Sequence, residues 1–146
     1  MLIKINFSQL THQAGIKQIQ IENRVPDYIT VSADRNMLSL VIRNLISNSI
    51  KFTHAGGKID ITAIDTGDGF VKATLQDNGI GMSPDLVEEL FKIDKRVSRP
   101  GTEGEPSSGL GLLLCHEFIQ KHGGTMIVES EENVGTSFHF TLPVAH

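Results

Sequence analysis

The stretch Asn44-Leu45-Ile46-Ser47-Asn48-Ser49-Ile50-Lys51-Phe52-Thr53 has the periodicity of a helix with two chemically different faces. With the residues just before it, it builds one broad apolar stripe made of Leu38, Val41, Ile42, Leu45 and Ser49. Asn44, Asn48 and Lys51 are spaced four and three apart, so they lie on one narrow line beside that stripe. Polar groups at the border of a buried stripe need partners or a cavity. The line therefore indicates either a helix edge bonded to neighbouring loops or one wall of a polar site.

The composition predicts one globular domain over residues 1–146. The chain has 39% apolar and 21% charged residues, which is ordinary for a soluble protein. Its net charge of −4 argues against a nucleic-acid backbone or an anionic membrane as the main partner. The single cysteine, Cys115, excludes an internal disulfide and a cysteine-based metal cluster, and it indicates a cytosolic context. No apolar run of about 18 residues and no signal-peptide pattern is visible.

Hydrophobic periodicity predicts the order helix, strands, helix, hairpin, helix, loop, helix, hairpin. The expected helices are 2–14, closed by Gly15, then 35–53, a short one from Pro84 and 112–122. The expected strands are 19–25, 28–32, 59–63, 71–77, 125–129 and 138–142. Because most strands pair with sequence neighbours, we expect a mixed, mostly antiparallel sheet covered on one face by about three helices. This is an α+β fold, a two-layer α/β sandwich rather than a doubly wound parallel sheet.

Asp77 ends a strand whose inward face is apolar. Side chains alternate along a strand, so residues 71, 73, 75 and 77 share one face. A buried carboxylate is costly unless it accepts hydrogen bonds, and Gly79 and Gly81 let the backbone turn and a ligand approach closely. An acceptor-only carboxylate in an apolar pocket suits an exocyclic amine, such as that of adenine. The alternative is that Asp77 caps the turn at Asn78, and both interpretations stay open here.

The segment 92–108 has no clear period and is rich in charge, Gly and Pro. Loops of this length are usually functional lids or disordered. Lys95, Arg96 and Arg99 suit phosphate charge. The glycines in 107–112 precede a helix, where unpaired N–H groups bind anions. The alternative is a flexible surface loop whose basic residues are solvated.

Together, the three segments suit adenine, a divalent cation and a triphosphate. Neither a P-loop nor a His-Arg-Asp kinase loop is present. Nearly the whole chain resembles the catalytic, ATP-binding domain of sensor histidine kinases, in the superfamily shared with gyrase-type topoisomerases, certain chaperones and MutL-type repair proteins. The matching motifs are the N box at 44–53, the first glycine box at 77–82, the F box at Leu90-Phe91, the second glycine box at 109–112 and Gly135-Thr136.

The resemblance implies a role for each matched position. Asn48 would hold Mg²⁺ through its side-chain oxygen, and Asn44 would support the phosphates or the waters of the metal. Lys51 would reach the phosphates, Phe52 would pack on adenine, and Asp77 would accept a hydrogen bond from the adenine amine. The further implied positions are Gly79, Gly81 and Thr136 near the base, the backbone amides of Ser108, Gly109, Leu110, Gly111 and Leu112 at the phosphates, and Lys95, Arg96 or Arg99 at the γ-phosphate.

Two features depart from a complete kinase of this family. None of the histidines lies in a phospho-acceptor motif of the His-Glu-Leu-Arg type, and the strand that usually opens the domain is absent. The helix expected at 2–14 also lacks a cap, so we expect an excised cytoplasmic domain. The resemblance implies phosphorylation of a histidine on a separate dimerisation domain. It also implies a response-regulator receiver domain as partner, with no nucleic acid and no direct membrane contact.

Two alternatives remain at this stage. One is a stand-alone serine kinase of the anti-sigma-factor type, which has a comparable length; the long lid and the Asn-Ser-Ile-Lys-Phe-Thr style of the N box favour the histidine kinase. The other is a non-catalytic module that senses nucleotide or docks a partner. The intact Asn44, Asn48, Lys51 and Asp77, with both glycine boxes, argue against a decayed site.

Overall fold

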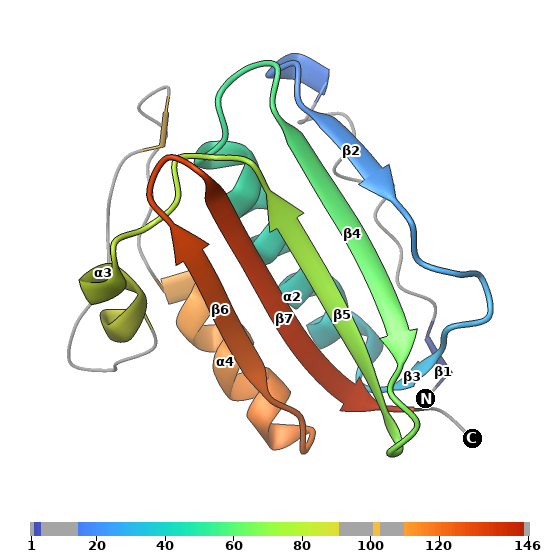
Figure 1. Cartoon of the computed structure of the whole chain (residues 1–146). Helices are drawn as coiled ribbons and strands as arrows, with labels where there is room; N and C mark the ends of the chain where they lie inside the picture. Colours follow the sequence, from blue (N-terminus) through green and yellow to red (C-terminus); the bar gives the residue numbers. More distant parts are fainter. Residues whose placement is uncertain (1, 4–14, 91–100, 103–109, 145–146) are drawn as a thin grey trace.

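A computed structural model describes residues 2–3, 15–90, 101–102 and 110–144. Its main element is a five-stranded sheet in the order β2-β4-β5-β7-β6 (Figure 1). The strands are β2 (Gln20–Asn23), β4 (Lys58–Asp65), β5 (Phe70–Asp77), β6 (Met126–Glu131) and β7 (Gly135–Pro143). β2 pairs parallel with β4, and the other neighbours pair antiparallel. The predicted mixed, mostly antiparallel sheet is therefore confirmed.

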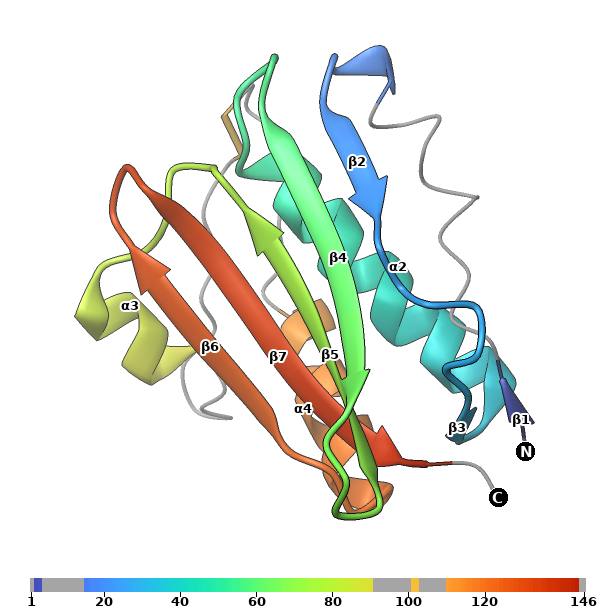
Figure 2. The ribbon, with the colours of Figure 1, turned by 45° about the vertical axis from the view of Figure 1, so that its right-hand side comes forward.

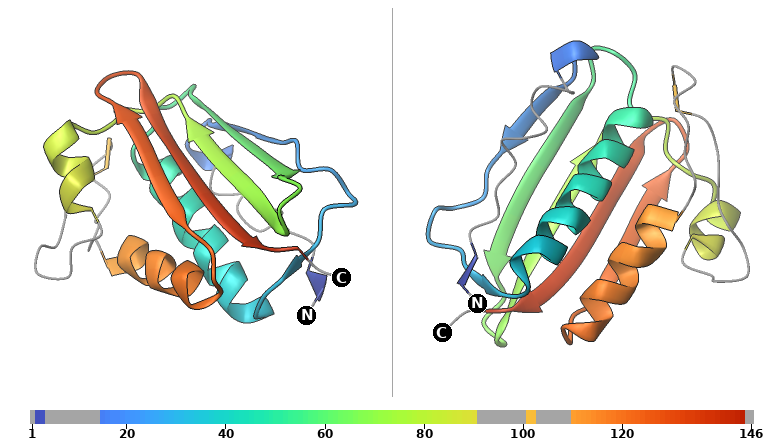
Figure 3. Two further views of the ribbon diagram at one scale, coloured as in Figure 1. Left: turned by 60° about the horizontal axis from the view of Figure 1, so that its bottom comes forward. Right: turned by 180° about the vertical axis from the view of Figure 1, so that it is seen from behind.

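Two long helices cover one face of this sheet. Helices α2 (Arg35–Lys51) and α4 (Leu110–Lys121) lie side by side on it, and Figure 2 shows the two layers. The view from behind in Figure 3 shows the same pair across the strands. The short helix α3 (Pro84–Glu89) lies beyond β6, at the edge of the sheet. The predicted α+β two-layer sandwich is thus confirmed. Across the described residues, no helix has both the length and the apolar composition needed to span a bilayer.

Helix α2 forms the centre of the helical layer. Asp34 caps its N-terminus, because Oδ1 accepts the Met37 N–H at 3.0 Å. The buried residues of α2 are Leu38, Val41, Ile42, Leu45, Ile46, Ser49 and Ile50. Each large aliphatic side chain buried in this way contributes about 1.5–3 kcal/mol. The predicted apolar stripe thus sets the rotation of the helix about its axis and leaves Asn44, Asn48 and Lys51 half-buried at its border.

The N-terminal region differs from the prediction. Leu2–Ile3 forms strand β1, which pairs antiparallel with β3 (Val31–Ser32) in a separate two-stranded sheet. The predicted helix over 2–14 is wrong at its first two described residues, and so is the expected absence of an opening strand. Pairing with a distant segment outweighs local helical periodicity here. Residues 4–14 lie outside the described part. The predicted end at Gly15 is also wrong, since residues 15–16 are helical and Gln18 takes the left-handed conformation at φ 61°.

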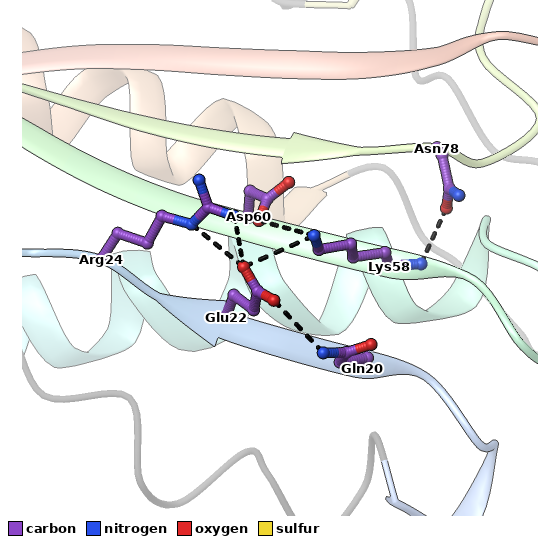
Figure 4. Close-up of polar contacts among 6 residues, drawn as sticks. All are labelled: Gln20, Glu22, Arg24, Lys58, Asp60 and Asn78. Carbon is purple, nitrogen blue, oxygen red and sulfur yellow. Dashed lines mark hydrogen bonds and ion pairs between the residues drawn. The ribbon is translucent and has the colours of Figure 1, made fainter.

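The open face of the sheet carries a charged cluster across the parallel pair β2 and β4 (Figure 4). Arg24 Nε donates to Glu22 Oε2 at 3.0 Å, and Lys58 Nζ lies 3.4 Å from the same oxygen and 3.7 Å from Asp60 Oδ1. The hydrogen bond from Arg24 holds the pKa of Glu22 below its ordinary value. These groups are solvent-accessible, so their main effect is to match the charges of the two strands rather than to add much stability.

His139 lies at the middle of the same face, on β7. Its Nδ1 is 2.9 Å from Thr74 Oγ1, and its Nε2 is 3.3 Å from Glu129 Oε1. Burial lowers the pKa of His139 from its ordinary value of 6.5, with help from Lys72, while Glu129 opposes the shift. The unfolded chain therefore takes up the proton at a higher pH than the folded protein does. The stability that this imidazole contributes is complete above its unfolded pKa and is lost as pH falls toward its folded pKa.

We expect the unfolding free energy of the wild-type chain to decrease more steeply on acidification than that of a His139→Gln variant. Urea denaturation at about pH 8 and about pH 5 measures both. A His54→Gln variant, at an exposed position, controls for the removal of one imidazole. An equal loss of stability on acidification in the wild type and His139→Gln would contradict a lowered pKa of His139 as the cause.

Candidate functional site

Asp77 is buried at the end of β5, with 7% of its surface exposed. Its Oδ1 accepts two backbone N–H groups, from Gly79 at 2.9 Å and from Thr136 at 3.2 Å. The inward orientation predicted from strand alternation is confirmed, and so is the turn-capping interaction. The two interpretations are compatible, because both hydrogen bonds end on the same carboxylate oxygen. The carboxylate is therefore held in a fixed position inside the fold.

The glycine turn after Asp77 passes very close to other backbone. A Cβ built on Gly79 would lie 2.2 Å from the carbonyl oxygen of Phe52, and one on Gly81 would lie 1.9 Å from that of Glu131. Between them, the Ile80 N–H donates to the Phe52 carbonyl at 2.9 Å. The turn thus lies between the end of α2 and the β6–β7 hairpin. Only glycine leaves room for this path.

Thr136, the last predicted position near the base, is buried beside Asp77. Its Oγ1 lies 2.8 Å from Ser130 Oγ, which also accepts the Met82 N–H at 2.8 Å. Sequence reasoning missed Ser130. A signal for it existed, since Met126, Val128 and Ser130 alternate on the inward face of β6. Ser130 links the glycine turn to β7 and so supports the position of Thr136.

Asn78 also holds the glycine turn in place, although it was not among the predicted site residues. Its Oδ1 accepts the Lys58 N–H at 2.8 Å (Figure 4), and its own N–H donates to the Lys58 carbonyl at 3.3 Å. These bonds continue the β4–β5 pairing by one residue beyond Asp77. The only sequence signal was a turn-forming residue between Asp and Gly.

Asn44 contacts the beginning of α4. A Cβ added to Gly111 would lie 3.4 Å from the Asn44 side chain, and that side chain also hydrogen-bonds Cys115. Burial raises the pKa of the Cys115 thiol to about 11, and the bond from Asn44 opposes part of this shift. Cys115 is thus the core residue that was predicted. Asn44 therefore lies next to Gly111 of the second glycine box.

The C-terminal end of α2 carries Asn48 and Lys51, and the next residue, Phe52, bonds the glycine turn through its carbonyl. The side chains of Asn48 and Lys51 are half-buried, and Phe52 is buried. The Lys51 carbonyl accepts the N–H of Thr102, a residue of the predicted lid segment, at 2.8 Å. Two hydroxyls of this region, Ser49 Oγ and Thr53 Oγ1, are buried without a hydrogen-bond partner in the described structure. Unpaired buried hydroxyls are costly unless water or a ligand bonds them.

Several predicted positions cannot be located. Lys95, Arg96, Arg99, Ser108, Gly109 and the F-box residue Phe91 lie outside the described residues. Leu110 is the first residue of α4, so the helix predicted from 112 begins two residues earlier. Leu112 is buried. Across the described ranges, no group of three or more His, Cys, Asp or Glu residues gathers to hold a metal ion.

Comparison with protein families gives a match over residues 33–146 to the model described as histidine kinase-, DNA gyrase B-, and HSP90-like ATPase. A similar curated relative is the adaptive-response sensory kinase SasA of Prochlorococcus marinus (strain AS9601). It is 40% identical over 131 residues, which cover 88% of this chain and 35% of SasA. The chain therefore spans about a third of the length of this relative.

Two solved structures extend the comparison. Full-length ShkA in complex with AMPPNP has a TM-score of 0.74 and 29% identity, covering 99% of this chain and 31% of ShkA. Histidine kinase ThkA in complex with the response regulator protein TrrA has a TM-score of 0.73 and 26% identity, covering 94% of this chain and 38% of ThkA. The sheet and helical layer described above therefore match those of solved histidine kinases.

Proposed function

The chain belongs to the family of histidine kinase-, DNA gyrase B- and HSP90-like ATPases, and on that premise we propose that it binds Mg·ATP and presents the γ-phosphate to a histidine on a separate dimerisation domain. In this proposal the domain acts in two-component signal transduction in the cytoplasm. A response-regulator receiver domain would then take up the phosphoryl group from that histidine. The complex of ThkA with TrrA supports a partner of this class.

The observation that carries the proposal is the fixed, buried carboxylate of Asp77. Two backbone N–H groups bond its Oδ1. We assign Oδ2, the second acceptor atom of this carboxylate, to the exocyclic amine of adenine. Gly79 and Gly81 keep the turn in place next to this carboxylate, because a Cβ on either would collide with the carbonyl of Phe52 or Glu131. Phe52 lies against the same turn through its carbonyl, at the position proposed for packing on the base. The bound AMPPNP of ShkA supports a nucleotide of this class.

The phosphate side of the proposed site is built on α2 and α4. Asn48 would hold Mg²⁺, which would neutralise charge on the phosphates, and Lys51 would contact a phosphate oxygen. Asn44 would lie beside them, since its side chain is next to Gly111 in the second glycine box. The N-terminal amides of α4 suit anions because the first N–H groups of a helix have no intrahelical partner. The remaining proposed contacts are the amides of Ser108, Gly109, Leu110, Gly111 and Leu112 and one of Lys95, Arg96 and Arg99.

This set of groups fits phosphoryl transfer. That reaction requires mainly positioning and charge neutralisation, and the proposed site supplies both without a nucleophile of its own. The attacked histidine, and the base that assists it, would lie on the separate domain. We therefore expect the isolated chain to bind nucleotide and to turn it over slowly.

Calorimetry with ADP and with a non-hydrolysable ATP analogue tests the function, in Mg²⁺ and in excess EDTA. We expect binding that is stronger in Mg²⁺. The absence of binding heat with both nucleotides would overturn the proposal. Transfer to a cognate histidine-containing domain gives a further check, because phosphohistidine is acid-labile and phosphoserine is not.

An Asn48→Ala variant is expected to bind ADP about tenfold more weakly in Mg²⁺, because one oxygen ligand to a charged group is lost. Removing Mg²⁺ with EDTA should then change its affinity much less than that of the wild type. Asn36→Ala, an exposed substitution near the start of the same helix, is the matched control. If Asn48→Ala kept the full Mg²⁺ dependence, the metal assignment would be wrong.

A further inference from the structure

Lys17 is a buried lysine that the proposed site does not include. Only 7% of its surface is exposed, and it lies in the turn before β2. Its Nζ donates to two carbonyls at the end of α2, that of Ile50 at 2.8 Å and that of Lys51 at 3.1 Å. A lysine is rarely buried unless its ammonium is paired in this way. The position is therefore costly in itself and indicates a specific role at this helix end.

The end of α2 needs such a donor. The last carbonyls of a helix lack intrahelical partners, and a following glycine in the left-handed conformation commonly supplies N–H groups to them. Here the helix is followed by Phe52, at φ −101° and ψ 15°. The Thr53 N–H reaches the Ile50 carbonyl only at 3.4 Å. The ammonium of Lys17 thus replaces a glycine cap, and its charge matches the negative end of the helix dipole.

The same run of carbonyls contacts other parts of the proposed site. The Lys51 carbonyl, which Lys17 bonds, also accepts the Thr102 N–H at 2.8 Å. The next carbonyl, of Phe52, accepts the Ile80 N–H of the glycine turn at 2.9 Å. The Thr53 carbonyl accepts a hydrogen bond from the Thr102 hydroxyl, with 3.4 Å between the two oxygens. The helix end therefore connects the N box, the glycine turn and a residue of the predicted lid segment.

We propose that Lys17 is a positioning residue of the nucleotide site, which sets the carbonyl end of α2 and through it the glycine turn and Thr102. The inference rests on the proposed function for its effect on nucleotide, but its structural part does not need nucleotide. Backbone bonds of the residues just after Lys17 hold this part of the chain against the turn at Gly56 and Gly57. Gly56 N–H donates to the Gln18 carbonyl at 2.9 Å, and Gln20 N–H donates to the Gly57 carbonyl at 3.0 Å.

The first test uses the chain without nucleotide. Lys17→Met keeps the length of the side chain and removes the ammonium. In ¹H–¹⁵N spectra we expect the amide signals of Thr102 and Ile80 to shift, while those of the distant Asp65–Phe70 hairpin stay in place. Unchanged signals of Thr102 and Ile80 would overturn the inference, whatever the chain binds. Should Lys17→Met fail to fold, Lys17→Gln, which removes the charge and shortens the side chain but keeps a neutral NH₂ donor group, serves for the same measurement.

The second test is nucleotide affinity. We expect Lys17→Met to bind Mg·ADP about tenfold more weakly, and Lys17→Arg to restore most of that affinity through its own charged donors. Lys121→Met, an exposed lysine in the last turn of α4, is the matched control. Wild-type affinity in Lys17→Met would overturn the role in binding. Shifted amide signals together with a wild-type chain that binds no nucleotide would instead overturn the proposed function and leave the structural role standing.

Discussion

An Asp77→Asn variant is expected to bind ADP at least about 100-fold more weakly than the wild-type chain. Asparagine has nearly the same shape, so the fold should persist. Its amide oxygen must take the place of Oδ1, because the N–H groups of Gly79 and Thr136 both donate to that atom. The NH₂ group then occupies the position of Oδ2, where the adenine amine is proposed to donate. Two donors then face each other, and burying a donor without an acceptor costs free energy.

The matched control is Asp65→Asn. Asp65 Oδ1 accepts the Gly67 N–H at 2.9 Å, which repeats the geometry between Asp77 and Gly79, but Asp65 is exposed and lies at the other end of β4. Calorimetry at a temperature where both variants are folded gives the affinities. We expect Asp65→Asn to bind as the wild type does. If Asp77→Asn lost less than about threefold in affinity, the carboxylate would not be the group that recognises the base.

The orientation of Asp77 was predictable from sequence because strand alternation is a local rule. Val71, Ala73 and Leu75 identify the inward face of β5, and Asp77, two residues after Leu75, lies on the same face. The same holds for α2, where the apolar stripe determines the side on which Asn44 and Asn48 lie. Such patterns need no knowledge of the partner segment. They are sufficient to predict which side chains of β5 point inward, how α2 is rotated about its axis, and where its line of polar side chains lies.

Features that depend on distant backbone were not predictable in this way. Strand β1 forms because Leu2 and Ile3 pair with Ser32 and Val31, and the local alternation of Ile3, Ile5 and Phe7 with polar residues does not identify that partner. The role of Lys17 had no signal in the sequence, because it depends on the position in the fold of the last carbonyls of α2. Pairings that are distant in sequence are decided by tertiary packing, which local propensity does not encode.

A Gly81→Ala variant is expected to lose roughly 3 kcal/mol or more of its unfolding free energy, enough to unfold much of a marginally stable domain. Gly81 has φ +66°, where a Cβ costs about 1–2 kcal/mol by itself. The added Cβ would also lie 1.9 Å from the Glu131 carbonyl oxygen, and backbone cannot move aside as a flexible side chain can. The β6–β7 hairpin and the glycine turn would have to separate.

Comparison with Gly67→Ala separates the collision from the conformational cost. Gly67 has φ +80° in the hairpin between β4 and β5, and a Cβ there would meet nothing within 4 Å. It should lose only the conformational cost of about 1–2 kcal/mol and keep full nucleotide affinity. Urea denaturation measures the difference between the two variants, which reports the collision alone. Equal losses would mean that the Gly81 turn can move away from Glu131, and the site would then be less rigid than the bonds of Asp77 imply. A larger loss at Gly81, with weakened ADP binding in the fraction that stays folded, would instead tie the stability of this turn directly to the shape of the nucleotide site.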